Sequence, residues 1–250
     1  MNISVFSSNK EVSARAAELI AELLREKPDA VLGLATGDTP IGVYEALVER
    51  FKRGEVSFRQ ASAFNLDEYA GLPPEHEQSY AAYMAKHLLN EIDLPLDRAY
   101  IPNGLAADLE AESKAYDRLL EQAGQLDLQL LGIGHNGHIG FNEPGPHLHA
   151  GTHVVALTEE TRDANSRYFD HLEDVPSQAV TMGVGWMMKA KHVVLIARGE
   201  GKAAVVKEAL FGPITTSCPG SLLQLHPRLT VLLDEGAARD VQGLPGVRYL

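Results

Sequence analysis

Residues 126–144, Leu-Asp-Leu-Gln-Leu-Leu-Gly-Ile-Gly-His-Asn-Gly-His-Ile-Gly-Phe-Asn-Glu-Pro, join an apolar run to a loop rich in glycine. The run from Leu126 to Leu131 is short and apolar, which indicates a buried strand. Glycine at Gly132, Gly134 and Gly137 lets the backbone take positive φ and lets a ligand approach with no Cβ in the way. Because open α/β sheets bind small molecules at the carboxyl ends of their strands, this stretch predicts a binding loop after a central strand.

The same loop carries two groups that can take part in proton transfer. His138 stands five residues before Glu143, so an imidazole and a carboxylate that can orient it lie in one loop. Glycine-rich turns alone are common, and the presence of these two side chains is what favours an active-site loop.

Outward from this stretch, strands and helices alternate along the chain. Strands are expected in short apolar segments at 3–6, 30–35, 61–66, 99–101, 126–131, 153–157, 179–182, 192–197 and 229–233. Helical patterns lie between several of them, from Ser8 or Asn9 to Lys27, after Pro40, and at 78–89, 108–122, 160–169 and 201–210. This alternation predicts a Rossmann-like α/β fold, a doubly wound and mostly parallel sheet flanked by helices, with the active site at the carboxyl ends of the strands.

Composition limits the classes of partner. The 250 residues are 45% apolar and 22% charged, as in ordinary globular proteins, and we expect one catalytic domain over 1–250. A formal net charge of −12 argues against nucleic acid or an anionic membrane, because both require clustered Lys and Arg. The first residues lack a signal-peptide pattern, no apolar run reaches membrane-spanning length, and the single cysteine cannot form an intrachain disulfide. We therefore expect a cytoplasmic protein.

The turn Thr36-Gly37-Asp38-Thr39-Pro40 is a candidate phosphate site. It joins a buried strand to a helix, whose first N–H groups and dipole favour an anion, and Thr36 and Thr39 add hydroxyl donors. The alternative is that Asp38 or Thr39 caps the helix with Pro40 at its first position. The turn alone favours neither interpretation.

Further charged residues follow other strands. Asp67 and Glu68 come just after the strand at 61–66, where an acid could act as a general base. Arg167 and Lys202, each near a helical pattern, could supply the fixed positive charge that a phosphate requires. Taken alone, such residues are more often solvated surface charges.

Several motifs together resemble the glucosamine-6-phosphate deaminase family across nearly the whole chain. They are Leu-Ala-Thr-Gly-Asp-Thr-Pro (34–40), Phe-Asn-Leu-Asp-Glu-Tyr (64–69), Gly-His-Asn-Gly-His-Ile-Gly-Phe-Asn-Glu-Pro (134–144), Thr-Arg-Asp-Ala-Asn-Ser-Arg (161–167), Met-Gly-Val-Gly (182–185) and Leu-Gln-Leu-His-Pro (223–227). The second and third motifs are specific to that family. The Thr-Gly-x-Thr-Pro turn is shared with the related 6-phosphogluconolactonases.

The resemblance implies a reaction and the residues that perform it. The family converts glucosamine 6-phosphate to fructose 6-phosphate and ammonium, with no metal or organic cofactor. By resemblance, Asp67 is the base that carries a proton between C2 and C1, His138 opens the sugar ring, and Glu143 orients that histidine. The phosphate is assigned to the turn from Thr36 to Thr39 together with Arg167 and Lys202.

Two departures from the family pattern carry expectations of their own. Many members have aspartate at the position of Asn136; an amide can orient a histidine without favouring its charged form, so we expect Asn136 to share the ring-opening role while Glu143 supplies the charge. Allosteric hexameric members carry a basic Arg-x-Lys segment where this chain has His153-Val154-Val155. We therefore expect hyperbolic kinetics and a monomer or small homo-oligomer.

Two other functions remain open from the sequence. A 6-phosphogluconolactonase-like esterase would use the same fold and phosphate turn but needs no counterpart of Asp67. A catalytically inactive sugar-phosphate sensor is disfavoured because Asp67, His138 and Glu143 are all present and no DNA-binding segment is attached. No residue identifies whether the glucosamine or the galactosamine epimer is preferred.

Overall fold

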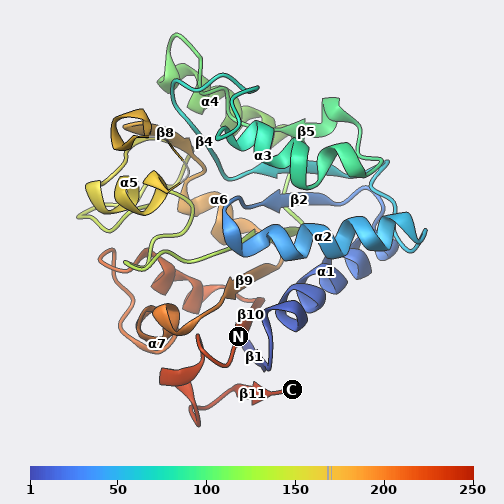
Figure 1. Ribbon diagram of the computed structural model, residues 1–250, viewed down its shortest axis with the longest axis vertical. Helices are drawn as coiled ribbons and strands as arrows, with labels where there is room; N and C mark the ends of the chain where they lie inside the picture. Colours follow the sequence, from blue (N-terminus) through green and yellow to red (C-terminus); the bar gives the residue numbers. More distant parts are fainter. Residues whose placement is uncertain (168, 170) are drawn as a thin grey trace.

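A computed structural model describes residues 1–167, 169 and 171–250, which form a layered α/β structure (Figure 1). Within these residues, eight parallel strands form one sheet in the order β11-β1-β10-β9-β6-β2-β3-β5. Their bounds are β1 (Asn2–Phe6), β2 (Val31–Leu34), β3 (Ser62–Asn65), β5 (Ala99–Tyr100), β6 (Leu128–Leu131), β9 (Val193–Ala197), β10 (Leu229–Asp234) and β11 (Val247–Tyr249). The predicted Rossmann-like parallel sheet is confirmed.

A second, antiparallel sheet was not predicted. It has the order β4-β8-β7, with β4 at Asp67–Tyr69, β8 at Gln178–Thr181 and β7 at His153–Ala156. The segments expected as strands near 153–157 and 179–182 are therefore strands of this small sheet. One edge of the large sheet is formed by β11, a strand that was not predicted from the sequence.

Helices cover both faces of the large sheet. On one face, α1 (Asn9–Glu26), α2 (Asp38–Lys52) and α3 (Tyr80–His87) pack into one apolar core, and on the other α4 (Leu109–Ala123), α6 (Val184–Lys189) and α7 (Ala203–Phe211) pack into a second. The residues of β9 alternate between these cores, with Val194 and Ile196 in the first and Val193 and Leu195 in the second. This two-sided burial explains why the strands read as apolar runs.

The remaining helical elements are short. The helix expected at 160–169 is α5 (Glu159–Ser166); residue 168 of that range, like residue 170, lies outside the described residues. The 3₁₀ turns are η1 (Leu89–Glu91), η2 (Leu96–Arg98), η3 (Leu172–Asp174), η4 (Glu200–Lys202), η5 (Pro219–Leu225) and η6 (Arg239–Val241). None of the described helices has the length and apolar character that crossing a lipid bilayer requires.

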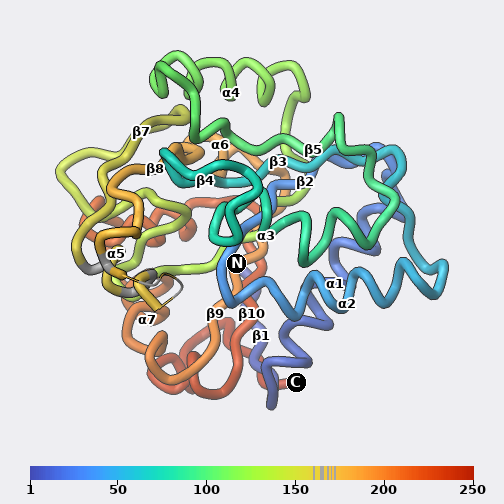
Figure 2. The backbone as a smooth tube through the Cα atoms, turned by 45° about the horizontal axis from the view of Figure 1, so that its top comes forward, coloured from blue at the N-terminus to red at the C-terminus, as the bar shows by residue number. Residues whose placement is uncertain are grey.

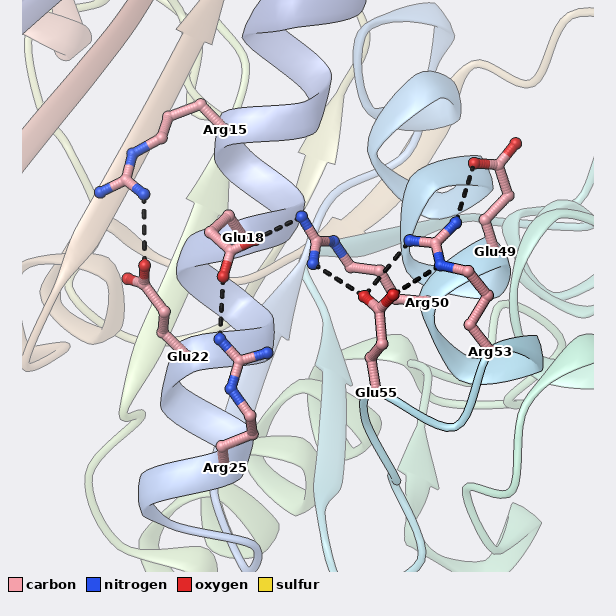
Figure 3. Close-up of polar contacts among 8 residues, drawn as sticks. All are labelled: Arg15, Glu18, Glu22, Arg25, Glu49, Arg50, Arg53 and Glu55. Atoms are coloured by element: carbon pink, nitrogen blue, oxygen red, sulfur yellow. Dashed lines mark hydrogen bonds and ion pairs between the residues drawn. The ribbon is translucent and has the colours of Figure 1, made fainter.

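Polar contacts fix the start of α1 and its contact with α2. Ser8 is the N-cap, accepting a hydrogen bond from the N–H of Glu11, whose carboxylate accepts from the N–H of Ser8 in return. Figure 3 shows Arg50 of α2 between Glu18 of α1 and Glu55, so one guanidinium joins the two helices. The cap at Ser8 directly follows β1, whereas the Arg50 contacts lie at the last turn of α2, away from the carboxyl ends of the strands.

The strand order places the carboxyl ends of four neighbouring strands where the chain reverses its direction across the sheet. From β2 the chain proceeds outward to β3 and β5, and from β6 it proceeds the opposite way to β9 and β10 (Figure 2). Because β2 and β6 are neighbours, the loops after β9, β6, β2 and β3 converge at this reversal. Open α/β sheets bind ligands at such a point.

Candidate active site

The loop after β6 holds His138 against its own backbone. A Cβ on Gly134 would overlap the imidazole ring of His138, so glycine at this position makes room for the ring. Gly137 has φ +87, and a Cβ there would overlap the sulfur of Cys218. Of the three glycines expected to use positive φ, only Gly137 does so; Gly134 is needed to make room for the imidazole, and Gly132 has neither requirement.

Glu143 lies beside the imidazole of His138. Its Oε2 is 3.3 Å from Nδ1 of His138, within ion-pair distance although the two groups are not aligned as a hydrogen bond. The same oxygen accepts a hydrogen bond of 2.8 Å from the side-chain amide of Asn136, and Oε1 accepts one from the hydroxyl of Thr161. The carboxylate is therefore held by groups on both sides.

These partners keep Glu143 ionised. Burial acts to raise the pKa of Glu143, but the adjacent imidazole of His138, with the hydrogen bonds from Thr161 and Asn136, lowers it below its ordinary value. Asn136 also accepts the N–H of His138 through its amide oxygen over 3.2 Å. Asn136 thus contacts His138 directly at its backbone N–H. It affects the imidazole ring only indirectly, by holding the Glu143 carboxylate beside it.

Asp67 is a buried carboxylate at the start of β4. Its exposed fraction is 5%. Burial, with a smaller contribution from Glu68, raises the pKa of Asp67 to about 8. A positive charge brought close to Asp67 would favour its ionised form.

Glu68 has a different role from its neighbour. Successive residues of a strand face opposite sides, and the Glu68 carboxylate accepts the N–H groups of Tyr69, Tyr80 and Ala81 at 2.8, 2.9 and 2.9 Å. Burial raises the pKa of Glu68 above its ordinary value although these bonds lower it. Glu68 therefore anchors the start of α3.

The loop after β6 packs on Asp67. A Cβ on Gly140, which follows His138 by two residues, would lie 3.4 Å from Oδ2 of Asp67 and 3.2 Å from the hydroxyl oxygen of Thr181. The backbone of the histidine loop and the carboxylate are thus in close proximity. The two segments, to which the family resemblance assigns one reaction, are far apart in the chain and are brought together by the fold.

The turn after β2 forms the start of α2. Gly37 is the N-cap, with φ 95 and no side-chain cap, and the helix begins at Asp38, so the alternative in which Asp38 or Thr39 caps the helix with Pro40 first is wrong. Glycine at the cap leaves the first N–H groups of α2 without a side-chain partner. The side chain of Thr36 lies beside the phenol of Tyr80, whose pKa burial raises well above its ordinary value, with a smaller contribution from the charge of Asp67.

Several cations lie near this turn, among them Arg198, which donates a hydrogen bond to the backbone carbonyl oxygen of Asp38. Arg167, whose side chain is 64% exposed, donates to the carboxylate of Asp38 over 2.7 Å. Lys202, in η4 after β9, donates to the carbonyl oxygen of Ile133 over 2.8 Å. Burial, with a contribution from the charge of Arg167, lowers the pKa of Lys202 to about 8. Asp38 therefore holds Arg167 instead of adding an unpaired negative charge to the turn.

The structure thus brings the predicted residues to one edge of the large sheet and adds three that the sequence analysis missed. Thr161, Tyr80 and Thr181 contact Glu143, Thr36 and the histidine loop, respectively. A hydroxyl in a helix or strand carries no local signal of such a role. Among the described residues, no three His, Cys, Asp or Glu side chains are grouped so as to hold a metal ion.

Comparison with known proteins identifies close relatives. Residues 7–231 match the family described as glucosamine-6-phosphate isomerases/6-phosphogluconolactonase. The chain is 49% identical to the glucosamine-6-phosphate deaminase of Thermoanaerobacter pseudethanolicus, over 95% of this chain and 94% of that protein. It is 51% identical to the glucosamine-6-phosphate deaminase of Bacillus velezensis, over 95% and 99% of the two chains.

Solved structures give the same relationship. A monomeric glucosamine-6-phosphate deaminase superposes with a TM-score of 0.94 at 45% identity, covering 96% of this chain and all of that one (100%). The 6-phosphogluconolactonase of Trypanosoma brucei superposes with a TM-score of 0.75 at 22% identity, over 96% and 98% of the chains, which shows the shared fold alone.

Proposed function

The chain belongs to the family of glucosamine-6-phosphate isomerases and 6-phosphogluconolactonases, and we propose that it converts D-glucosamine 6-phosphate and water to D-fructose 6-phosphate and ammonium. The chain shares 49% and 51% sequence identity with two glucosamine-6-phosphate deaminases over 95% of its length, and this supports deamination over lactone hydrolysis. The structural observation that carries the proposal is the packing of the His138 loop against Asp67. A lactonase moves no proton from C2 and has no use for that carboxylate.

The phosphate is the anchor of the proposed complex. The N–H groups at the start of α2, the hydroxyls of Thr36 and Thr39, and the cations of Arg167 and Lys202 are suited to a dianion. Anchoring at this end supplies binding energy that positions C1 and C2 of the sugar near Asp67. Asp38 supports this role by holding Arg167, and Gly37 by leaving the helix start open.

Ring opening is assigned to His138. Its imidazole takes the proton of O1 and delivers a proton to the ring oxygen as the bond between C1 and that oxygen breaks. Glu143 stabilises the imidazole while it carries the extra proton, since its carboxylate stays ionised 3.3 Å away. Asn136 and Thr161 hold Glu143 in place.

Isomerisation is assigned to Asp67. Its carboxylate removes the proton from C2 of the open-chain aldehyde and returns a proton to C1, while the ammonium on C2 gives up one proton and the aldehyde oxygen O1 gains one. The product of this step carries a hydroxyl on C1 and a protonated imine at C2. Water adds to this imine, and nitrogen leaves as ammonium. Although burial raises the pKa of Asp67 to about 8, the ammonium on C2 of the bound substrate favours its ionised form.

One experiment tests the function and the assigned base. Purified parent protein and Asp67→Asn are supplied with glucosamine 6-phosphate, and ammonium and fructose 6-phosphate are measured together; 6-phosphogluconolactone is supplied in parallel. The parent releases both products in equal amounts, and D67N loses turnover while still binding inorganic phosphate. Equal turnover by both proteins would remove Asp67 from the mechanism, and hydrolysis of the lactone alone would overturn the deaminase function.

A further inference from the structure

The end of β8 contacts the strand that carries Asp67. Thr181, the last residue of β8, pairs with Asp67 across the antiparallel ladder. The N–H of the next residue, Met182, donates to the carbonyl oxygen of Leu66 over 2.6 Å. The position of Asp67 is therefore set by β8, because β4 pairs with no other strand in the described part of the chain.

The same end of β8 also holds the loop that carries His138. The hydroxyl oxygen of Thr181 accepts the N–H of Phe141 over 3.1 Å. The side-chain amide of Asn142 donates to the carbonyl oxygens of Met182 and Ile139, each over 2.9 Å. Thr181, the last residue of β8, and Met182, the residue after it, thus contact both catalytic segments.

These hydrogen bonds are buried, so their loss cannot be compensated by water. Thr181 is fully buried, and Phe141 and Asn142 are 5% and 2% exposed. A buried N–H that loses its acceptor has no water to replace it, so either the backbone shifts or the donor stays unpaired. The Thr181 hydroxyl also lies close to Gly140 on the side that faces Asp67, since a Cβ on Gly140 would be 3.2 Å from it and 3.4 Å from Oδ2 of Asp67.

We propose that Thr181 is a positioning residue that sets the separation between Asp67 and His138. Its backbone pairs with Asp67, and its hydroxyl ties the histidine loop at Phe141 to the same strand. The inference rests on the proposed function, in which the two side chains act on adjoining atoms of one sugar. Because the phosphate is bound by other segments, a changed separation lowers turnover more than it lowers substrate binding.

Three substitutions separate the hydroxyl from the bulk of the side chain. Thr181→Val keeps the shape and removes the acceptor, Thr181→Ala removes the acceptor without adding a methyl group, and Thr181→Ser keeps the acceptor. We expect T181V and T181A to lower kcat by about tenfold to a hundredfold, while T181S stays within about threefold of the parent. The KM for glucosamine 6-phosphate and the inhibition constant of inorganic phosphate should change by less than about threefold in all three.

Thr230→Val is the matched control. The Thr230 hydroxyl lies 2.8 Å from Nε2 of His192, and Thr230 stands near the start of β10, at the opposite end of the sheet from the active site. This variant should lower Tm and leave kcat unchanged. The inference is overturned if T181V and T181A keep kcat within about threefold, if T181S loses as much as they do, or if T230V loses kcat equally. If the parent protein itself is inactive, the proposed function fails and the inference fails with it. If the parent is active and the variants behave as just described, only the inference fails.

Discussion

The ammonium group of Lys202 donates a hydrogen bond of 2.8 Å to the carbonyl oxygen of Ile133, which ties the turn after β9 to the loop after β6. This bond holds a half-buried cation beside Arg167, at the edge of the sheet where the substrate phosphate is placed. Burial of the ammonium, with the charge of Arg167, explains why the pKa of Lys202 is lowered to about 8.

Substrate binding should therefore weaken in alkaline solution. Lys202 loses its charge as pH rises through a pKa of about 8, so KM for glucosamine 6-phosphate should rise between about pH 7 and about pH 9. Steady-state kinetics over this range measure the effect. In Lys202→Met, KM should be high throughout and should no longer rise; a parallel rise in the variant would assign the effect to another group.

Gly134 and Gly132 provide a matched pair in the histidine loop. A Cβ at Gly134 overlaps the ring of His138, whereas a Cβ at Gly132 meets nothing within 4 Å. Gly134→Ala should lower kcat by about a hundredfold because the imidazole is displaced, and Gly132→Ala should keep nearly full turnover. Equal rates for the two variants would contradict the account of the loop.

Asn136→Asp should shift the pH dependence of the rate. A carboxylate at 136 would lie beside Glu143 and the backbone of His138, where it favours a positively charged imidazole. The acid limb of the rate profile should move to higher pH by about one unit or less. Asn136→Ala, which removes the amide without adding charge, is the control, and an unmoved limb in N136D would refute the coupling.

His192 should make the fold sensitive to acid. This histidine is 6% exposed, and burial, with the charges of Arg228 and His226, lowers its pKa to about 4. The folded protein binds this proton only at a lower pH than the unfolded chain does. The free energy of unfolding is therefore highest above the ordinary pKa of 6.5 and declines as pH falls toward about 4. At about pH 5, this histidine should lower the free energy of unfolding by about 2 kcal/mol relative to neutral pH.

Urea unfolding near neutral and mildly acidic pH measures this loss. In His192→Gln, which removes the titrating group, the difference in unfolding free energy between the two conditions should shrink by that amount. An unchanged difference would show that other groups determine the acid sensitivity.

The chain should follow hyperbolic kinetics. The segment His153-Val154-Val155 lacks the Arg-x-Lys pattern, and a similar solved deaminase is monomeric. Substrate saturation should therefore be the same with and without an acetylated amino-sugar phosphate, and light scattering should give a monomer or small oligomer. Sigmoidal rates that this effector relieves would contradict the prediction.

Much of the scaffold follows from local sequence. The apolar runs that became β2, β6 and β9 are buried on both faces, and Ser8 caps α1 as its residue type favours. The phosphate turn and the histidine loop were identified for the same reason, because a strand followed by glycine is a local pattern.

The rest depends on long-range contacts. The strand Asp67–Tyr69 is three residues long and has no alternating apolar pattern, so its pairing with β8 could not be predicted. The bond from Thr161 to Glu143 joins residues 18 apart through the packing of the loop on α5. The raised pKa of Asp67 also follows from burial, which is a property of the folded chain.

The division of the strands between two sheets has a consequence for how such a protein can change. Thr36, Thr39 and Lys202, which are suited to the phosphate, follow β2 and β9 of the large sheet, whereas Asp67 lies on the small one. Mutations in the small sheet can therefore change the reaction while the protein continues to bind phosphorylated sugars. An engineer seeking new chemistry on phosphorylated sugars would randomise β4, β8 and β7 first.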